Sequence, residues 1–221
     1  MSNREDKLIG TTKGEVKEMC RDMPPLELAI QFHGHICPGL LMGVRAAEFA
    51  REQLGVGPDR DEELVAIVET DSCGVDAIQA ILGCTFGKGN LIFRDYGKNV
   101  YTIISREKGR AIRIAQKFGS LKGRDSERYH ELARKNELTE SETSEKENLL
   151  GVIFEKIMSS AFTDLFDWRE VDVDIPVKAQ IHSTIQCAGC GEGVMATRAR
   201  ETDQGWLCPT CLDQIGGKVS V

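Results

Sequence analysis

The stretch from Leu64 to Gln116 reads LVAIVETDSCGVDAIQAILGCTFGKGNLIFRDYGKNVYTIISREKGRAIRIAQ and determines the architecture that we expect. It holds four short runs rich in β-branched and apolar residues, which are typical of strands because such side chains pack well on a pleated surface. A helical run follows the first of these strands. Polar side chains just before the helical run can cap its start, and Gly83 ends the run. The breaks at 96–99 and 108–109 resemble hairpin turns. We predict strands at Leu64–Glu69, Leu91–Asp95, Val100–Arg106 and Arg110–Gln116, and a helix at Gly74–Leu82.

Two prolines mark helices before this stretch. Pro25 opens a short helix that runs to Phe32, and Pro38 opens a second helix that stops near Gly55. Proline suits a first helical turn because its missing N–H would have no partner there.

The segments after the stretch are more ambiguous. Residues 126–148 are strongly charged and form either an exposed helix or a helix followed by a linker. Residues 149–160 are amphipathic, so we expect a helix that packs on the sheet or on a second copy of the chain. Residues 171–176 alternate and predict a last edge strand.

This order of elements predicts an α+β protein with a two-layer core. We expect a mixed or antiparallel sheet covered by helices, with the core order α-β-α-β-β-β. The domain organisation that we predict is an N-terminal arm at 1–22, a core domain at 23–178 and a small metal-binding domain at 184–215.

Composition excludes some classes of partner. The chain has 221 residues, of which 41% are hydrophobic and 29% charged, as in ordinary globular proteins. Its formal net charge of −7 disfavours nucleic acid and anionic membranes as partners, since both are bound through clustered Lys and Arg. No apolar run approaches the roughly 18 residues of a membrane span, and the N-terminus MSNREDKLIG lacks the apolar region of a secretory signal. We therefore expect a protein of the reducing cytoplasm, where cysteine clusters serve metal binding or catalysis.

Four of the eight cysteines lie near the C-terminus in two C-x-x-C pairs. CAGC and CPTC are separated by 17 residues, which is the spacing of a zinc ribbon. Each pair forms a tight turn that directs two sulfurs at one point, and thiolates select zinc or iron. Two redox-active pairs are the alternative. The segment carries three basic and four acidic residues, so docking of a protein or a lid role is favoured over nucleic-acid binding. We predict a structural zinc held by Cys187, Cys190, Cys208 and Cys211.

A second candidate site begins with the segment HGHICPG. Cys37 precedes the proline that opens a helix, and Cys73 precedes the next predicted helix, where a helix dipole favours a thiolate. With His33 or His35 these thiols would give three protein ligands and leave one position open for water or substrate, as in reactive metal sites. We therefore assign metal-binding and catalytic roles to all four residues. The alternative for each one alone is a buried small residue or a hydrogen-bonding histidine.

Two other cysteines lie outside this scheme. Cys84 follows Cys73 by 11 residues, or about 16 Å across the predicted helix, so both cannot bind one ion. We expect Cys84 to be buried or to line a pocket. Cys20 lies in the charged arm and receives no role.

A glycine-rich turn, TFGKGN, suggests a site for an anionic cofactor or ligand. Its backbone N–H groups could hold phosphate or carboxylate, with Lys88 supplying charge and Lys98 of the next turn bordering the same pocket. It lacks the Gly-Lys-Ser/Thr of a P-loop. A plain hairpin turn is the alternative.

Several strings together resemble the FmdE family, which takes its name from a component of formylmethanofuran dehydrogenase. The resemblance covers about residues 26–165 and rests on FHGHICPG, GVR, DAIQ, CTFGKGN and DYGK, with the C-terminal cluster resembling a ribbon found in some members. It implies the same α-β-α-β-β-β core, a homodimer, and a metal near His33, His35, Cys37 and Cys73. It also implies an association with a tungsten- or molybdenum-dependent enzyme that reduces carbon dioxide onto a C1 carrier.

Three functions remain open at this point. The first is a metal-binding accessory protein or subunit of a molybdenum or tungsten enzyme, with a reactive transition-metal site, zinc by preference, and a structural zinc ribbon. The second is a stand-alone metal- or thiol-dependent enzyme, a hydrolase or an oxidoreductase, in which Cys37 and Cys73 form a reversible disulfide in the redox version. The third is a regulatory or nucleic-acid-binding zinc protein, which the acidic ribbon disfavours.

Overall fold

The computed structural model describes residues 23–216, so the arm at 1–22 and Cys20 lie outside the described residues. The chain divides into two compact units between Lys178 and Ala179. The first unit contains α2 (Pro25–His33), α3 (Pro38–Leu54), β1 (Leu64–Val68), α4 (Gly74–Leu82), β2 (Leu91–Phe93), β3 (Val100–Ser105), β4 (Arg110–Gln116), α5 (Arg124–Ala133), α6 (Glu140–Ser159), α7 (Phe162–Leu165) and β5 (Phe166–Glu170). The second contains β6 (Thr184–Gln186), β7 (Gly193–Met195), β8 (Arg200–Thr202), β9 (Gly205–Leu207) and α8 (Pro209–Gln214).

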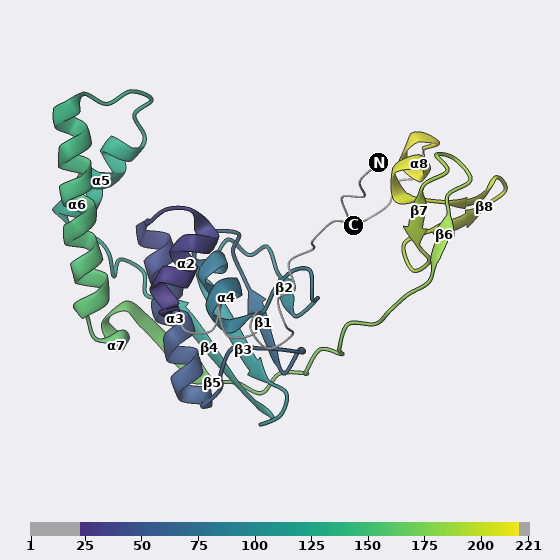
Figure 1. Ribbon diagram of the computed structural model, residues 1–221, viewed down its shortest axis with the longest axis horizontal. Helices are drawn as coiled ribbons and strands as arrows, with labels where there is room; N and C mark the ends of the chain where they lie inside the picture. The colour runs from purple at the N-terminus through teal and green to yellow at the C-terminus, as the bar shows by residue number, and fades with distance from the viewer. Residues whose placement is uncertain (1–22, 217–221) are drawn as a thin grey trace, which may run out of the picture. The chain divides into compact units, whose positions relative to one another are not determined.

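A mixed five-stranded sheet in the order β2-β1-β3-β4-β5 forms the first unit's β layer (Figure 1). β1 and β2 are parallel and are connected by α4, whereas the pairs β1–β3, β3–β4 and β4–β5 are antiparallel. The predicted α+β class, with a mixed sheet covered by helices, is confirmed.

The predicted hairpin turn at 96–99 is wrong. The crossover through α4 places β2 at the outer side of β1, and β3 pairs with the opposite side of β1. Residues 96–99 therefore connect two strands that are not neighbours. Parallel pairing of this kind requires a long crossover rather than a tight turn, and the helix at Gly74–Leu82 supplies it.

The predicted edge strand at 171–176 is also wrong. The edge strand is β5, directly before it, and Val171 contributes only one further backbone bond, from its N–H to the carbonyl of Ala111. Val171 and Val173 instead pack on the sheet face formed by Val65, Ile67 and Ile104. Their alternation therefore reflects packing onto a sheet face and not a place in the ladder.

The charged segment after β4 forms two helices. Thr139 caps α6 in a capping box: its hydroxyl accepts the N–H of Glu142, whose carboxylate accepts the N–H of Thr139. α6 buries Ile153 and Ile157 in the main core. Arg45 of α3 donates to the carbonyls of Met158 and Ser160, each at 2.9 Å, and so joins α3 to the end of α6.

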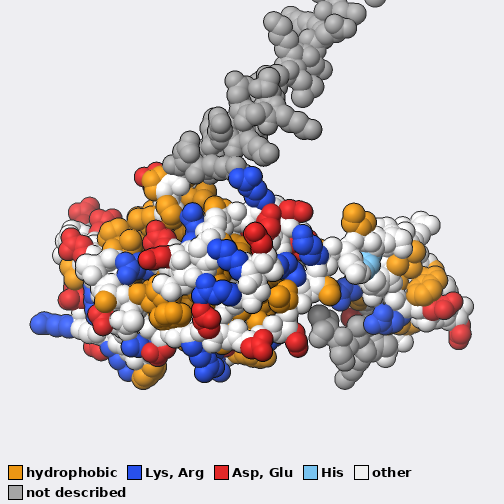
Figure 2. All heavy atoms as spheres, turned by 90° about the horizontal axis from the view of Figure 1, so that it is seen from below, with side chains coloured by type: hydrophobic (Ala, Val, Ile, Leu, Met, Phe, Trp, Pro, Cys, Tyr) orange, Lys and Arg blue, Asp and Glu red, His pale blue; other side chains and the backbone are white. Residues whose placement is uncertain are grey.

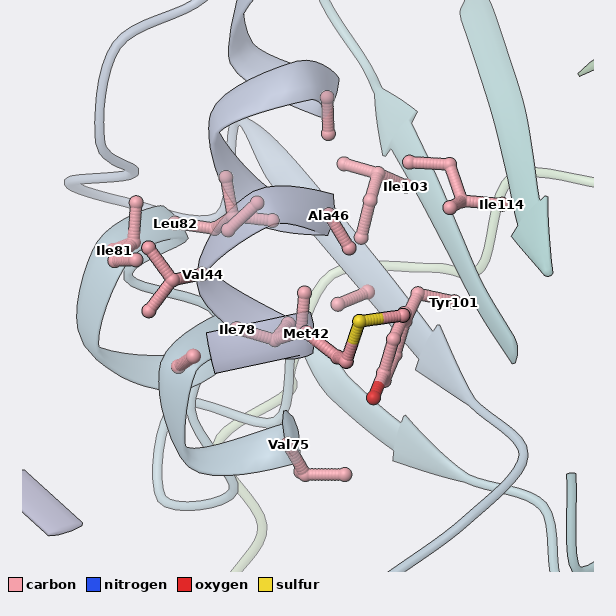
Figure 3. Close-up of a cluster of buried hydrophobic side chains, with 14 of the residues drawn as sticks. Met42, Val44, Ala46, Val75, Ile78, Ile81, Leu82, Tyr101, Ile103 and Ile114 are labelled. Atoms are coloured by element: carbon pink, nitrogen blue, oxygen red, sulfur yellow. The ribbon is translucent and has the colours of Figure 1, made fainter. Parts of the chain in front are cut away.

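The main core lies between the sheet and the helices α3 and α4. Met42 and Val44 of α3, Ile78 of α4, and Tyr101 and Ile103 of β3 point into it (Figure 3). On the face of the molecule that Figure 2 shows, basic and acidic side chains are interspersed. Among the described helices, none has the length and apolar composition required of a membrane span.

Candidate functional site

The segment HGHIC connects α2 to α3 through a sharp turn. α2 ends at Gly34, whose φ of 91° is a left-handed conformation that favours glycine. Cys37 then caps α3: its backbone is extended, and its Sγ accepts the N–H of Leu40 at 3.3 Å. The proline after Cys37 begins the helix, so the local sequence itself fixes this sulfur at the N-terminus of α3.

Two glycines bring the start of α4 against α3. A Cβ on Gly43 would lie 2.3 Å from the carbonyl oxygen of Gly74, so the two backbones touch here. One turn earlier, a Cβ on Gly39 would lie 3.3 Å from the Cβ of Cys73 and 3.9 Å from the sulfurs of both Cys37 and Cys73. The close packing of the two helices therefore places two cysteines distant in sequence at one spot.

The histidines approach the same spot from the end of α2 and the turn after it. Ligand atoms of His33, His35 and Cys37 all lie within 4.8 Å of one another. The Nε2 of His33 is 3.8 Å from the Sγ of Cys37, and the two imidazole centroids are 4.4 Å apart. The structure thus brings together three of the four predicted ligands as one group, with the thiol of Cys73 beside Cys37.

Burial controls the charge of Cys37. It raises the pKa of this thiol; the N–H of Leu40 acts in the opposite direction, and the neighbouring Cys73 raises the pKa further. The N–H of Leu40 at the start of α3 therefore favours the thiolate, as expected for a helix N-terminus, but burial has the larger effect on the pKa of the metal-free thiol. A divalent cation between the sulfur and the imidazoles would supply the positive charge that a thiolate needs.

Two residues near this site were not assigned by the sequence. The Oδ2 of Asp76 in α4 lies 2.7 Å from the Nδ1 of His33, within hydrogen-bond distance. Tyr129 of α5 is buried, and burial raises the pKa of its phenol, with the charges of Cys37 and Cys73 adding to the effect. The signal for Asp76 was its place three residues after Cys73, on the first turn of a helix. Tyr129 had none beyond being a large aromatic residue in a charged segment.

The two lysines expected to bind an anion lie apart from each other along the sheet. Lys88 precedes the start of β2 and Lys98 follows its end. The ammonium of Lys88 pairs with the carboxylate of Asp59, whose side chain is fully buried. Asn90 donates to the same carboxylate at 3.0 Å and to the carbonyl of Leu64 at 3.1 Å. These bonds connect the turn TFGKGN to the loop before β1. Anion binding by Lys88 or Lys98 stays a prediction.

Cys84 lies in the core next to that turn. It has no exposed surface, and burial raises the pKa of its thiol to about 12. The residue is therefore an inert buried thiol, as its distance from Cys73 along the helix led us to expect.

The C-terminal cysteines form a second group, the four-cysteine group, within the second unit. The four sulfurs of Cys187, Cys190, Cys208 and Cys211 lie within 4.8 Å of one another. The backbone turns around them: the N–H of Cys208 donates to the Sγ of Cys187 at 3.2 Å, and the N–H of Cys211 donates to the Sγ of Cys208 at 3.5 Å.

The thiols of this group differ in pKa: the side chain of Cys208, above all, raises the pKa of Cys211 to about 12. Backbone hydrogen bonds from Cys190 and Cys208 lower the pKa of Cys187 to about 6. Four thiol ligands with no open position are the donor set of a structural tetrahedral metal site.

Comparisons with known proteins agree with this architecture. A sequence model of the family described as "FmdE, Molybdenum formylmethanofuran dehydrogenase operon" matches residues 32–167. A protein of Archaeoglobus fulgidus named "Probable S-adenosyl-L-methionine-binding protein" is 33% identical over 190 residues, which is 83% of this chain. The chain spans about half of that relative's length, 51%.

A solved structure has the same fold. It is the crystal structure of a protein from Syntrophus aciditrophicus described as a "tungsten formylmethanofuran dehydrogenase subunit e (fmde)-like protein". The TM-score is 0.56 at 24% sequence identity, and the match covers 89% of this chain and 92% of that one.

Proposed function

The chain belongs to the FmdE family, and from this membership and the clustered Cys and His side chains we propose that it binds two metal ions with different tasks. The first ion, at the end of α2 and the starts of α3 and α4, is a reactive transition metal, zinc by preference. The second, in the four-cysteine group, is a structural zinc. The protein serves as an accessory protein or subunit of a molybdenum or tungsten enzyme of C1 metabolism.

The observation that carries the proposal is the meeting of the histidines with the two cysteines. His33, His35 and Cys37 form one group, and the helix contact at Gly43 and Gly74 adds the thiol of Cys73. Mixed nitrogen and sulfur donors fit zinc well. When bound, the ion would act as a Lewis acid or would activate a water molecule in a position that the protein leaves free.

The residues of the chain have separate tasks in this site. Cys37 and Cys73 provide sulfur ligands from two helix starts, and His33 provides a nitrogen that faces Cys37. His35 is more exposed than His33, so we assign it to the side from which substrate enters. The four-cysteine group keeps its small unit folded, because so few residues cannot bury an adequate core.

Metal content of variants of the full chain tests the proposal. Wild-type protein purified under reducing conditions is expected to hold two ions per chain. Cys37→Ser and Cys208→Ser are each expected to hold one ion and to lose different ones. A Cys37→Ser variant with the metal content of wild type would remove the reactive site.

A thiol-dependent enzyme is the second candidate, and the proximity of Cys37 to Cys73 favours it. Oxidation would join the two sulfurs in a disulfide and release two protons and two electrons to a small disulfide oxidant, which becomes two thiols. Counting the free thiols of the metal-free chain before and after incubation with that oxidant tests this candidate. If the wild-type chain loses no more free thiols than the Cys37→Ser variant does, the thiol-dependent enzyme is rejected.

Further parts of the proposal concern partners. We propose a homodimer and separate folding of residues 23–178 and 184–215, with residence in a reducing cytoplasm that keeps the ligand thiols available. Light scattering of the full chain tests the dimer, and a monomer mass would reject it. The name of the Archaeoglobus relative supports including S-adenosyl-L-methionine among the ligands tested by calorimetry.

A further inference from the structure

His33 is held by a hydrogen bond to a residue of α4. Its Nδ1 lies 2.7 Å from the Oδ2 of Asp76, a residue 43 positions later in the chain. The side chain of His33 is 11% exposed and that of Asp76 is 36% exposed, so the imidazole is shielded from water and the carboxylate is partly solvated. The Nδ1 of His33 therefore bonds to a residue of α4, and the Nε2 of the same ring faces the Sγ of Cys37.

The second carboxylate oxygen of Asp76 also accepts a hydrogen bond. Its Oδ1 accepts the Nε2 of Gln79 at 3.3 Å, one helical turn further along α4. The Oε1 of Gln79 in turn accepts the backbone N–H of Phe86 at 3.4 Å. A chain of hydrogen bonds thus runs from the turn after α4, through Gln79 and Asp76, to the imidazole.

We propose that Asp76 is a positioning residue that selects the tautomer of His33 and makes Nε2 the atom that binds the metal. An ionised carboxylate accepts hydrogen bonds and donates none, so the proton of the neutral ring must sit on Nδ1. The lone pair of Nε2 then points to the sulfur of Cys37, where the ion of the proposed function would lie. The inference rests on that proposed function.

The same contact accounts for the orientation of the ring. Metal-binding histidines generally donate their other N–H to a carboxylate or carbonyl, which fixes the ring and increases its basicity. Loss of such a partner typically lowers metal affinity by about 10–100-fold. His35 has no contact of this kind among the hydrogen bonds that the structure describes for residues 23–216, so the two histidines are not equivalent.

Competition with a chelator for Co²⁺, followed through its visible absorption bands, tests the proposal in the full chain. Asp76→Asn is expected to weaken binding at the N-terminal site by about 10–100-fold and to shift its spectrum. The four-cysteine group serves as an internal reference and should be unchanged. Asp71→Asn is the matched control, because Asp71 is exposed and precedes the same helix. Wild-type affinity and spectrum in Asp76→Asn would overturn the assignment.

Heteronuclear NMR of the His33 ring in the metal-free chain separates this inference from the proposed function. A proton on Nδ1 in the wild type, redistributed in Asp76→Ala, is the expected result. A proton on Nε2 in the wild type would contradict the inference even if metal binds. Absence of any ion at the site in the wild type would instead contradict the proposed function and leave the NMR result as the test of the tautomer.

Discussion

Gly43 of α3 and Gly74 of α4 touch through their backbones, since a Cβ on Gly43 would meet the oxygen of Gly74 at 2.3 Å. This contact sets the spacing of the two helix starts that carry Cys37 and Cys73. The geometry of the N-terminal site therefore depends on a packing contact that contains no ligand.

Gly43→Ala is expected to destabilise the chain by about 1–3 kcal/mol. The added methyl group would collide with the backbone of Gly74, so α3 and α4 would have to move apart. It should also weaken metal binding at the N-terminal site. Chemical denaturation and metal titration measure the two effects. Gly151→Ala is the matched control: nothing lies within 4 Å of that position in α6, so this change should stabilise the helix instead. Equal effects of both substitutions would contradict the role given to the glycine contact.

Lys88→Met is expected to cost on the order of 3 kcal/mol of stability, since it leaves the buried carboxylate of Asp59 without its cation. Lys98→Met changes an exposed lysine with the same substitution and should leave the free energy of unfolding nearly unchanged. Denaturant unfolding of both variants makes the comparison. If Lys88→Met is as stable as wild type, the ion pair with Asp59 does not hold the turn TFGKGN.

Removal of metal should unfold the second unit and leave the first folded. The second unit's buried cluster consists of Cys187, Leu207 and Cys208, which is too little to fold without an ion, whereas the first has a continuous core between sheet and helices. Amide NMR spectra before and after chelation measure this. Collapse of signals from the whole chain, or no change at all, would contradict it.

The sequence predicted most elements of the core, because their boundaries are local. α4 and β4 have the predicted limits, since the left-handed Gly83 ends α4 and the left-handed Gly109 precedes β4. The side-chain cap expected at the start of α4 is not formed. β5 was missed because only Phe166 of its five residues is buried, so no alternation marks it. The position of β2 outside β1 could not be read from the chain, since it depends on where the crossover helix α4 packs.

The sequence was enough to predict the ligand residues of the candidate site. It was not enough to predict the hydrogen bond and the burial that position them. The spacing of His33, His35 and Cys37 within one short segment was visible, and so was the likeness of Cys73 to Cys37 as a residue before a helix. The bond between His33 and Asp76 joins residues 43 positions apart, so the sequence marks Asp76 only as an acidic residue on the first turn of a helix and does not reveal its partner. The burial that raises the pKa of Cys37 is likewise a property of the packed helices.

Anomalous diffraction from crystals of the full chain, recorded at the absorption edge of the bound metal, tests the central claim most directly. We expect two peaks per chain: one inside the four-cysteine group, and one bonded to His33 Nε2 and to the sulfurs of Cys37 and Cys73. A single peak in the four-cysteine group, with no density between His33 and Cys37, would contradict the claim.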